Sequence, residues 1–287
     1  MMSEILKVNG LTKSYRSFLL DHVSFSVPRG SIMGFIGENG AGKTTAIKLI
    51  LNEIEREAGE ISVFGLDNIK EERKIKEQIG VVFDECYFHK DFRAKDISKI
   101  FSGLFKTWDQ ALFQRYLREF RIPEGKSIEQ FSKGTKMKLS IASALAHHPK
   151  FLILDEATSG LDPIVRNEIL DILREFILDE NHAVLISTHI TSDLEQAADY
   201  ITFLHEGKIV FCRSKDDLIY SYGILKCGEN LLPSIEKRDA LRIRRNGFGC
   251  EVLVADKEKA RARYRGCVVD NVSLEDIMLF YIKGEIL

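Results

Sequence analysis

The chain carries at residues 37–44 the glycine-rich run Gly37-Glu38-Asn39-Gly40-Ala41-Gly42-Lys43-Thr44. This run fits the phosphate-loop pattern G-x-x-x-x-G-K-[ST] and lies between a strand-like apolar run, residues 32–36, and a helix-like stretch, residues 44–52. Glycine lets the backbone wrap closely around phosphate groups, and the start of the helix adds partial positive charge. The segment, continued by Thr45, predicts a nucleotide-binding loop in which Lys43 contacts the β and γ phosphates and Thr44 binds Mg²⁺.

Chemically active side chains follow two further apolar runs. Residues 151–154 end in Asp155 and Glu156, and residues 183–187 are followed closely by His189. In an open α/β sheet the carboxyl ends of the strands meet at one edge, where ligands bind. Asp155 is therefore the candidate Mg²⁺ ligand, Glu156 the candidate base for an attacking water, and His189 a third candidate catalytic residue. The alternatives are a solvated acid for Glu156 and a structural role for His189.

The order of apolar runs predicts the fold class. Strand-like runs alternate with helix-like stretches, as in a parallel sheet flanked by helices. We expect an α/β P-loop NTPase core with a parallel sheet, a small N-terminal antiparallel β subdomain, a helical insertion at residues 84–150 and a small α+β C-terminal accessory domain. A hairpin at residues 200–212 closes the core, so the predicted domains are 1–222 and 223–287.

The C-terminal segment has its own pattern. Residues 240–244 and 251–255 predict a hairpin around Asn246 and Gly247, and Ser273 with Asp276 predicts a capped helix. Residues 238–265 hold nine basic and four acidic side chains, a local charge of +5. This charge indicates either contact with anionic lipid or nucleic acid, or a solvated hairpin face that helps the chain to dimerise.

Composition limits the class of protein. The 287 residues are 45% hydrophobic and 29% charged, and 41 basic against 43 acidic residues give a net charge of −2. This balance is typical of a globular protein, and it provides no long-range field that steers the whole chain onto nucleic acid. The longest stretch without a charged residue is residues 181–192, too short to span a bilayer, and the N-terminus lacks the apolar region of a secretory signal. We expect a cytoplasmic protein whose five separated cysteines are reduced.

Two more motifs extend the phosphate loop into a family pattern. They are Phe131-Ser132-Lys133-Gly134-Thr135 and Ser159-Gly160-Leu161-Asp162. Over about residues 5–212 the chain resembles the nucleotide-binding subunit of an ABC transporter. The first motif occupies the place of that family's LSGGQ-type signature, and the second matches its D-loop. Ser132 also predicts a helix N-cap, whose free N–H groups favour a phosphate. The resemblance implies that this phosphate belongs to ATP held by a second subunit, identical or not, with Ser132, Gly134 and Asp162 completing the site. An ordinary capped helix is the alternative for Ser132.

The resemblance assigns two further positions near the nucleotide. It places Tyr15 as the aromatic residue that stacks on adenine, with Phe18 as a substitute and simple packing as the alternative. It also places Asp84 where the family has the Q-loop glutamine. Aspartate still offers oxygens to Mg²⁺ or water, but it adds negative charge and has no amide N–H to donate. We therefore expect Asp84 to be a metal-binding and catalytic residue that slows hydrolysis, partly offset by Lys133, unless both substitutions are neutral.

The implied partner is an integral membrane permease. In the family a short helix of the membrane subunit enters a groove beside the Q-loop, and residues 84–120 are rich in aromatic side chains that suit such an interface. The signature form and the C-terminal extension resemble exporters of peptides, antibiotics or lipid-linked molecules, so we expect a peripheral protein on the inner face of the membrane. The alternative is a soluble ABC-type ATPase acting on a ribosome or nucleic-acid complex. The short insertion without heptads and the single ATPase domain argue against it.

Overall fold

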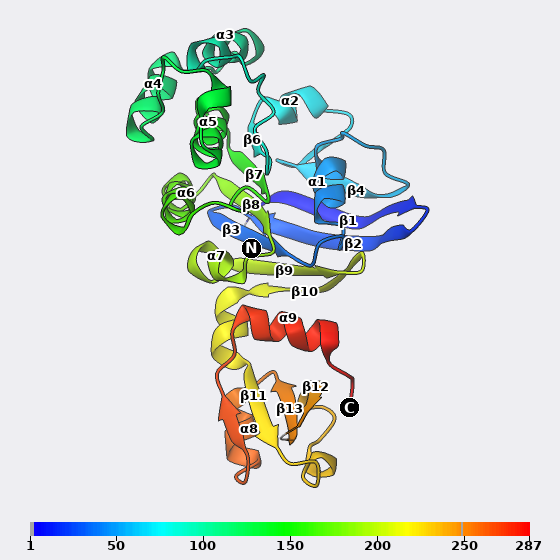
Figure 1. The fold of residues 1–287 in the computed structure, drawn as a ribbon. Helices are drawn as coiled ribbons and strands as arrows, with labels where there is room; N and C mark the ends of the chain where they lie inside the picture. Colours follow the sequence, from blue (N-terminus) through cyan, green and yellow to red (C-terminus); the bar gives the residue numbers. More distant parts are fainter. Residues whose placement is uncertain (1–2, 248) are drawn as a thin grey trace.

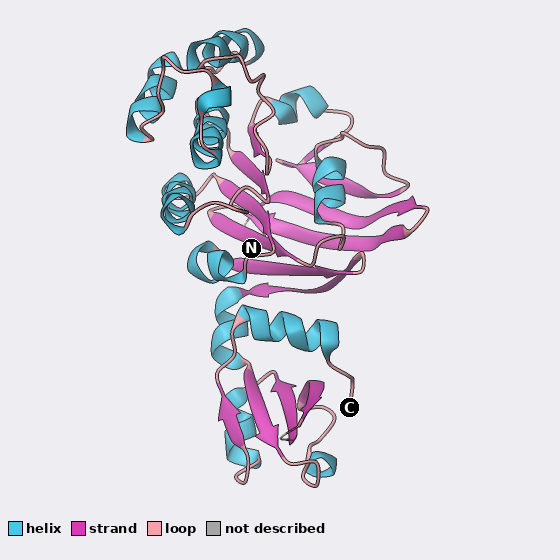
Figure 2. Cartoon of the chain, viewed as in Figure 1, coloured by secondary structure: helices cyan, strands magenta, loops and turns pink. Residues whose placement is uncertain are grey.

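The computed structural model describes residues 3–247 and 249–287, and within them the largest sheet has six strands (Figures 1 and 2). Their order is β10-β9-β3-β8-β7-β6, and β10 is antiparallel whereas the other neighbours are parallel. The bounds are β3 (Ser31–Ile36), β6 (Ile79–Val82), β7 (Phe151–Asp155), β8 (Ala183–Thr188), β9 (Tyr200–His205) and β10 (Lys208–Ser214). Strands β3, β7 and β8 are buried along their whole length, as expected for a sheet covered on both faces.

A second, antiparallel sheet covers one face of the first. Its order is β2-β1-β4-β5, with β1 (Glu4–Tyr15), β2 (Phe18–Pro28), β4 (Ala58–Val63) and β5 (Leu66–Asp67). Helix α1 (Lys43–Ile50) packs against both sheets, because its Ala46 and Ile47 share one core with Leu6 of β1 and Leu185 of β8. The predicted N-terminal antiparallel subdomain is confirmed.

Helices cover the other face and build the insertion. They are α3 (Ala94–Leu104), α4 (Gln110–Glu119), α5 (Lys133–Leu145), α6 (Pro163–Phe176) and α7 (Thr191–Ala197), with a 3₁₀ turn at Ile128–Gln130. The short helix α2 (Glu72–Lys76) instead packs through Ile75 into the core shared by the antiparallel sheet and α1. The helices α3, α4 and the start of α5 stand away from the central sheet around their own core, which includes Phe113 and Leu139 (Figure 1). The predicted helical insertion is therefore present. The sequence predicted a helix at residues 164–178, and the observed helix, α6, begins and ends slightly earlier.

The C-terminal part forms a third sheet, below the others in Figure 1. Its order is β12-β13-β11-β14, with β11 (Gly223–Cys227), β12 (Ala240–Asn246), β13 (Gly249–Val254) and β14 (Val268–Asp270), accompanied by a π-helical turn (Asp217–Ser221), a 3₁₀ turn (Leu232–Ser234), α8 (Lys257–Arg263) and α9 (Leu274–Lys283). The predicted hairpin is β12–β13, and Ser273 caps α9 by accepting a hydrogen bond from Asp276 N at 3.1 Å.

Helix α9 joins the C-terminal part to the core. Leu274 N donates to the Glu195 side chain of α7 at 2.7 Å, and Phe280 shares a hydrophobic core with Phe203 of β9. In Figure 1 this helix lies between the third sheet and the hairpin β9–β10. Across the residues the structure describes, we find no helix whose length and hydropathy would let it cross a bilayer.

Candidate functional site

The glycine-rich loop joins the end of β3 to the start of α1. Gly40 and Gly42 adopt left-handed conformations, with φ of 83° and 109°. A Cβ atom at Gly42 would lie 2.6 Å from Phe18 Cζ, and one at Gly37 would lie 2.3 Å from the Leu204 carbonyl oxygen. The contact with the Leu204 backbone excludes a side chain at Gly37, whereas at Gly42 the Phe18 ring could shift and the left-handed conformation is what favours glycine. Ala41 N closes the turn by donating to Glu38 O at 3.1 Å.

Lys43 is buried inside this loop. Its side chain is 5% exposed, and its Nζ donates to Gly37 O at 2.8 Å. The same Nζ lies 3.2 Å from Glu156 Oε1, across from β7. A buried ammonium needs such partners, because an unpaired charge in this environment is strongly destabilised. The lysine is thus fixed at the centre of the loop by carbonyl groups and one carboxylate.

Glu156 lies at the centre of the cluster. Its backbone φ is +53°, a conformation that costs a non-glycine residue about 1–3 kcal/mol and that is found mainly at functional sites. Oε2 accepts a hydrogen bond from Ser159 Oγ and lies 2.7 Å from His189 Nδ1, whereas Oε1 has the ion-pair contact with Lys43 Nζ at 3.2 Å. Burial raises the pKa of Glu156, but Ser159, Lys43 and His189 together outweigh it and lower that pKa below its ordinary value. The carboxylate is therefore ionised at neutral pH.

Oxygen ligands surround a cavity beside Glu156. The cavity has a volume of about 400 Å³, and its lining comprises Thr44, Lys48, Glu53, Phe83, Asp84, Tyr87, Asp155 and Glu156. Asp155 is held by Ser187 Oγ, which donates to its Oδ1 at 2.6 Å. Hydroxyl and carboxylate oxygens are the ligands that Mg²⁺ prefers, so the residues present fit this ion. Among the described residues no three His, Cys, Asp or Glu side chains form a metal site by themselves, which agrees with the need of Mg²⁺ for phosphate and water ligands.

A second cavity of about 510 Å³ adjoins the glycine-rich loop. Its lining comprises Ser17, Phe18, Glu38, Asn39, Gly40, Gly42, Lys43, Thr44, Thr45 and Glu156. Phe18 belongs to this lining, whereas the described residue Tyr15 does not. The Tyr15 side chain is 49% exposed, with its ring centroid 6.5 Å from that of Phe18. Of the two aromatic residues, Phe18 is thus the one beside the loop.

The signature and D-loop residues lie elsewhere. Ser132 caps α5 as predicted, because its Oγ accepts a hydrogen bond from Thr135 N at 3.2 Å, and the side chain is exposed. Asp162 caps α6 by accepting from Ile164 N and Val165 N, and a Cβ at Gly134 would lie 3.2 Å from Val165. As far as the structure describes the chain, Ser132, Gly134 and Asp162 line neither cavity. The structure therefore gathers the phosphate-loop residues, Asp84, Asp155, Glu156 and His189, but not the signature.

The supporting roles of two residues, Ser187 and the D-loop residue Ser159, escaped the sequence analysis. Ser159 and Ser187 donate to Glu156 and Asp155, and so they orient the two carboxylates. Ser187 carries a detectable signal, because it is a polar residue at the end of a buried strand directly beside β7. Ser159 offers a weaker one, since serine is common in any turn.

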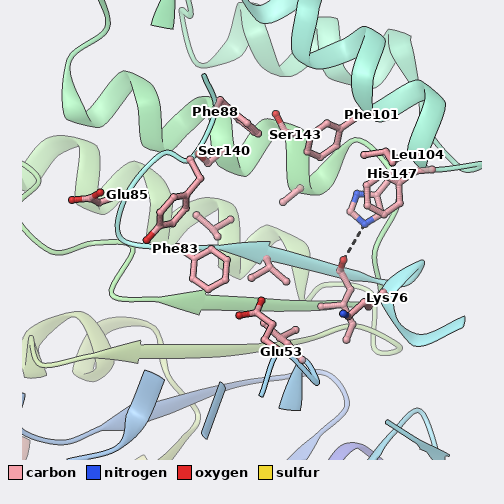
Figure 3. Close-up of a pocket in the computed structure, with 17 residues that line it drawn as sticks. Glu53, Lys76, Phe83, Glu85, Phe88, Phe101, Leu104, Ser140, Ser143 and His147 are labelled. Carbon is pink, nitrogen blue, oxygen red and sulfur yellow. Dashed lines mark hydrogen bonds between the residues drawn. The ribbon is translucent and has the colours of Figure 1, made fainter. Parts of the chain in front are cut away.

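A third cavity, the aromatic groove, lies between β6 and the helices α3 and α5 (Figure 3). It has a volume of about 530 Å³ and is lined by Leu51, Glu53, Lys76, Ile79, Val81, Val82, Phe83, Glu85, Tyr87, Phe88, Phe101, Leu104, Phe105, Ser140, Ser143, Ala144 and His147. His147 lies at its base, stacked on Phe105 with ring centroids 4.0 Å apart and with Nε2 3.1 Å from Ile79 O. Burial lowers the pKa of His147, so the ring is neutral and the groove is predominantly apolar.

The loop, the buried lysine and the ionised glutamate at the edge of a parallel sheet define a P-loop ATPase. The family model described as ABC transporter matches residues 20–159. The bacitracin transport ATP-binding protein BcrA of Bacillus licheniformis is 36% identical over 212 residues, covering 73% of this chain and 69% of the relative. The lantibiotic transport ATP-binding protein SrtF of Streptococcus pyogenes is 34% identical, covering 74% of this chain and 92% of the relative.

Solved structures agree with the sequence relatives. One described as the ATP-binding subunit of an ABC transporter has a TM-score of 0.68 at 28% identity, covering 75% of this chain and 92% of that chain. A dimeric cassette, MJ0796, bound to ADP and phosphate has a TM-score of 0.65 at 19% identity, covering 73% of this chain and 98% of that chain, and this likeness concerns the fold. The chain belongs to the ABC transporter family, as an ATP-binding subunit that hydrolyses ATP to drive transport.

Proposed function

We propose that the chain powers export of a peptide, antibiotic or lipid-like molecule through a separate membrane permease. The relatives named for bacitracin transport and for lantibiotic transport support this class of cargo. The observation that carries the motor function is the convergence of Lys43 and His189 on Glu156, at 3.2 Å and 2.7 Å. A cation for phosphates and an ionised base at one sheet edge are the groups that hydrolysis of a triphosphate requires.

Each residue of the site then has a stated task. Lys43 and the N–H groups of the loop bind the phosphates, and Glu156, ionised because its pKa is lowered, accepts the proton of the attacking water. His189, 47% exposed, orients the Glu156 carboxylate through Nδ1. Thr44, Asp84 and Asp155 would hold Mg²⁺, which supplies positive charge to the phosphate oxygens when bound. Tyr15 and Phe18 are the candidates for stacking on adenine, Phe18 because it lines the cavity.

We propose that the working unit contains two ATP-binding subunits. The capped start of α5 at Ser132 is exposed, and among the described residues Ser132 lines neither cavity beside its own chain's loop. A helix start of this kind favours an anion, and the γ-phosphate on a second subunit is the anion that the motif order implies. Gly134 and Asp162 belong to the same surface and complete the neighbour's site.

The aromatic groove is the proposed docking site for a short helix of the permease, at the inner face of the membrane. Its lining is mainly apolar and includes Leu104, labelled in Figure 3. Leu104 is 67% exposed, and Tyr87, also in the lining, is 73% exposed. Phe83 borders both this groove and the cavity that holds Asp84. Glu53 and Tyr87 also line both, so movement of a helix in the groove would reach the proposed metal site through three shared side chains.

The basic C-terminal segment supports a structural role better than a nucleic-acid contact. Arg242 and Arg244 stack on Tyr281 and Phe280, with guanidinium carbons 4.8 Å and 5.2 Å from the ring centroids. Other basic side chains form ion pairs within the same part of the chain: Arg238–Glu236, Arg245–Glu285, Arg261–Glu258 and Arg263–Asp239. We propose residues 223–287 as an accessory domain attached to the motor domain, 1–222, through α9.

Co-purification tests the permease partner. Leu104→Glu places a charge on the groove at a side chain that is already exposed, so the fold should survive while capture of a membrane protein from detergent extracts falls at least about tenfold. Leu178→Glu is the matched control, because Leu178 is 80% exposed and lies outside the groove. Equal capture by both variants would contradict docking in the groove, and capture of ribosomes in place of a membrane protein would favour the soluble alternative.

A further inference from the structure

Behind the sheet edge, a buried polar cluster connects the D-loop to the segment after β8. It consists of Thr158, Arg166 of α6 and Asp193 of α7. Arg166 Nη2 donates to Leu161 O at 3.2 Å, and Arg166 Nη1 lies 3.8 Å from Asp193 Oδ1. The Asp193 side chain is 3% exposed and Thr158 is fully buried. These side chains come from two segments that are far apart in sequence but whose helices pack side by side (Figure 1).

Each member of the cluster has an unpaired polar atom. Thr158 Oγ1, Arg166 Nε and Asp193 Oδ2 are buried and have no hydrogen-bond partner among the described residues. The Thr158 hydroxyl lowers the pKa of Asp193 through a contact that does not meet the geometry of a hydrogen bond. Burial of the Asp193 carboxyl raises this pKa by more, so the net shift is upward. Folded proteins keep few unpaired buried polar groups, and those that remain call for a functional explanation.

The placement of the cluster supplies that explanation. Thr158 follows Glu156 by two residues, and Asp193 follows His189 by four residues in the first turn of α7. Arg166 binds the main chain of the D-loop just before Asp162. The cluster thus links the D-loop to the segment after β8, the two segments that bring Glu156 Oε2 and His189 Nδ1 to 2.7 Å from each other. Within the described part of the chain, none of its three members lines the two nucleotide cavities.

We propose that Arg166 and Asp193 are positioning residues, which hold the D-loop and the His189 segment at a fixed separation and so keep Glu156 and His189 aligned. This inference rests on the proposed function, because it concerns the same hydrolytic site. The pair acts through Leu161 O on one side and through the first turn of α7 on the other. Loosening it should reduce turnover without reducing nucleotide affinity, since the phosphate-binding loop is untouched.

Arg166→Ala tests the proposal against a matched control in the same helix. Arg174→Ala also removes an α6–α7 link, because Arg174 Nη2 donates to Gln196 O at 3.0 Å, but Arg174 lies about two turns beyond Arg166, farther from the D-loop. Arg166→Ala should lower kcat by about ten- to a hundredfold, the effect of a misplaced catalytic group, with KM and ATP affinity nearly unchanged. Arg174→Ala should leave kcat near that of the wild type even if it lowers Tm. Equal kcat values for the two variants would overturn the proposal.

Conservative variants keep the test decisive if Arg166→Ala does not fold. Arg166→Lys retains the charge and should recover part of the lost kcat, and Asp193→Asn keeps the shape of the side chain while removing its charge. The two losses should not add in the double variant Arg166→Lys with Asp193→Asn, because both act on one contact. Additive losses, or wild-type kcat in Asp193→Asn, would overturn the pairing. Glu156→Gln measured alongside separates the two hypotheses: if it too has normal turnover, the proposed function fails, whereas its inactivity beside a normal Arg166→Ala refutes the positioning role alone.

Discussion

The loop side of the nucleotide site and the signature side differ in how far one chain completes them. Lys43 and His189 each contact Glu156 within a single chain, and Thr44, Asp84 and Asp155 line a cavity together with Glu156. Ser132 and Asp162, by contrast, are held in place as helix caps, and in the described structure they line neither nucleotide cavity. The first region is an assembled site, whereas the second is a preformed surface that lacks its ligand within the chain. We infer that the second region acts on another subunit.

Glu156→Gln should give the largest effect on the loop side. It removes the base but keeps the shape of the side chain, so ATP should still bind while turnover falls at least about a hundredfold. ATP should then stay bound between the two subunits, and the variant should elute as a dimer in size-exclusion chromatography. Lys43→Ala, which removes the phosphate-binding cation, serves as the binding-deficient control and should stay monomeric. Rapid turnover by Glu156→Gln would exclude this carboxylate as the base.

Ser132→Asp should give the next effect, on the signature side. Aspartate is as good an N-cap as serine, so α5 should remain folded, but the new charge repels a phosphate on the other subunit. We expect at least about a tenfold loss of turnover with normal ATP binding to the monomer. Ser127→Asp is the matched control, because Ser127 caps the neighbouring 3₁₀ turn Ile128–Gln130.

Mixing two inactive chains sharpens the same comparison. In a mixed dimer of Ser132→Asp and Lys43→Ala, one of the two sites combines an intact loop with an intact signature. Partial recovery of ATPase activity in the mixture would therefore demonstrate that the two regions work across the interface. Without any recovery, although the chains exchange, the split site would be wrong.

The sequence predicted those parts of the site that depend on neighbouring residues. The loop from Gly37 to Thr44 is specified by its own glycines. Asp155 and Glu156 stand at the end of a buried strand, which an unbroken run of apolar residues predicts. The central sheet, the N-terminal antiparallel sheet, the insertion and the Ser273 cap were predictable for the same reason, because each rests on a local pattern. Their exact ends were less so, since the last turn of a helix depends on packing.

The remainder depends on contacts between distant segments. His189 Nδ1 and Glu156 Oε2 lie 2.7 Å apart although the two residues follow different strands. The spacing of residues in the sequence does not predict this contact. Phe18 rather than Tyr15 lines the loop cavity because of how the hairpin β1–β2 turns, which the side-chain types do not reveal. Strands β11 and β14 and helix α8 are short and lack a clear periodicity, so the sequence left them unassigned.

Asp84→Gln should give the smallest change in ATPase activity. It tests the role of the cavity that lies beside both the loop side of the site and the aromatic groove. Asp84 shares its cavity with Glu53, Asp155 and Glu156, so four carboxylates line the cavity proposed for one metal ion and one water. Restoring an amide removes one negative charge next to the triphosphate and adds a donor, and basal ATPase activity should rise by about two- to tenfold. Glu53→Gln is the control, because it removes a charge from the lining of the same cavity at a position that the family pattern does not assign. A rise in both variants would indicate a general effect of charge, whereas a rise confined to Asp84→Gln would identify this position as a brake on hydrolysis.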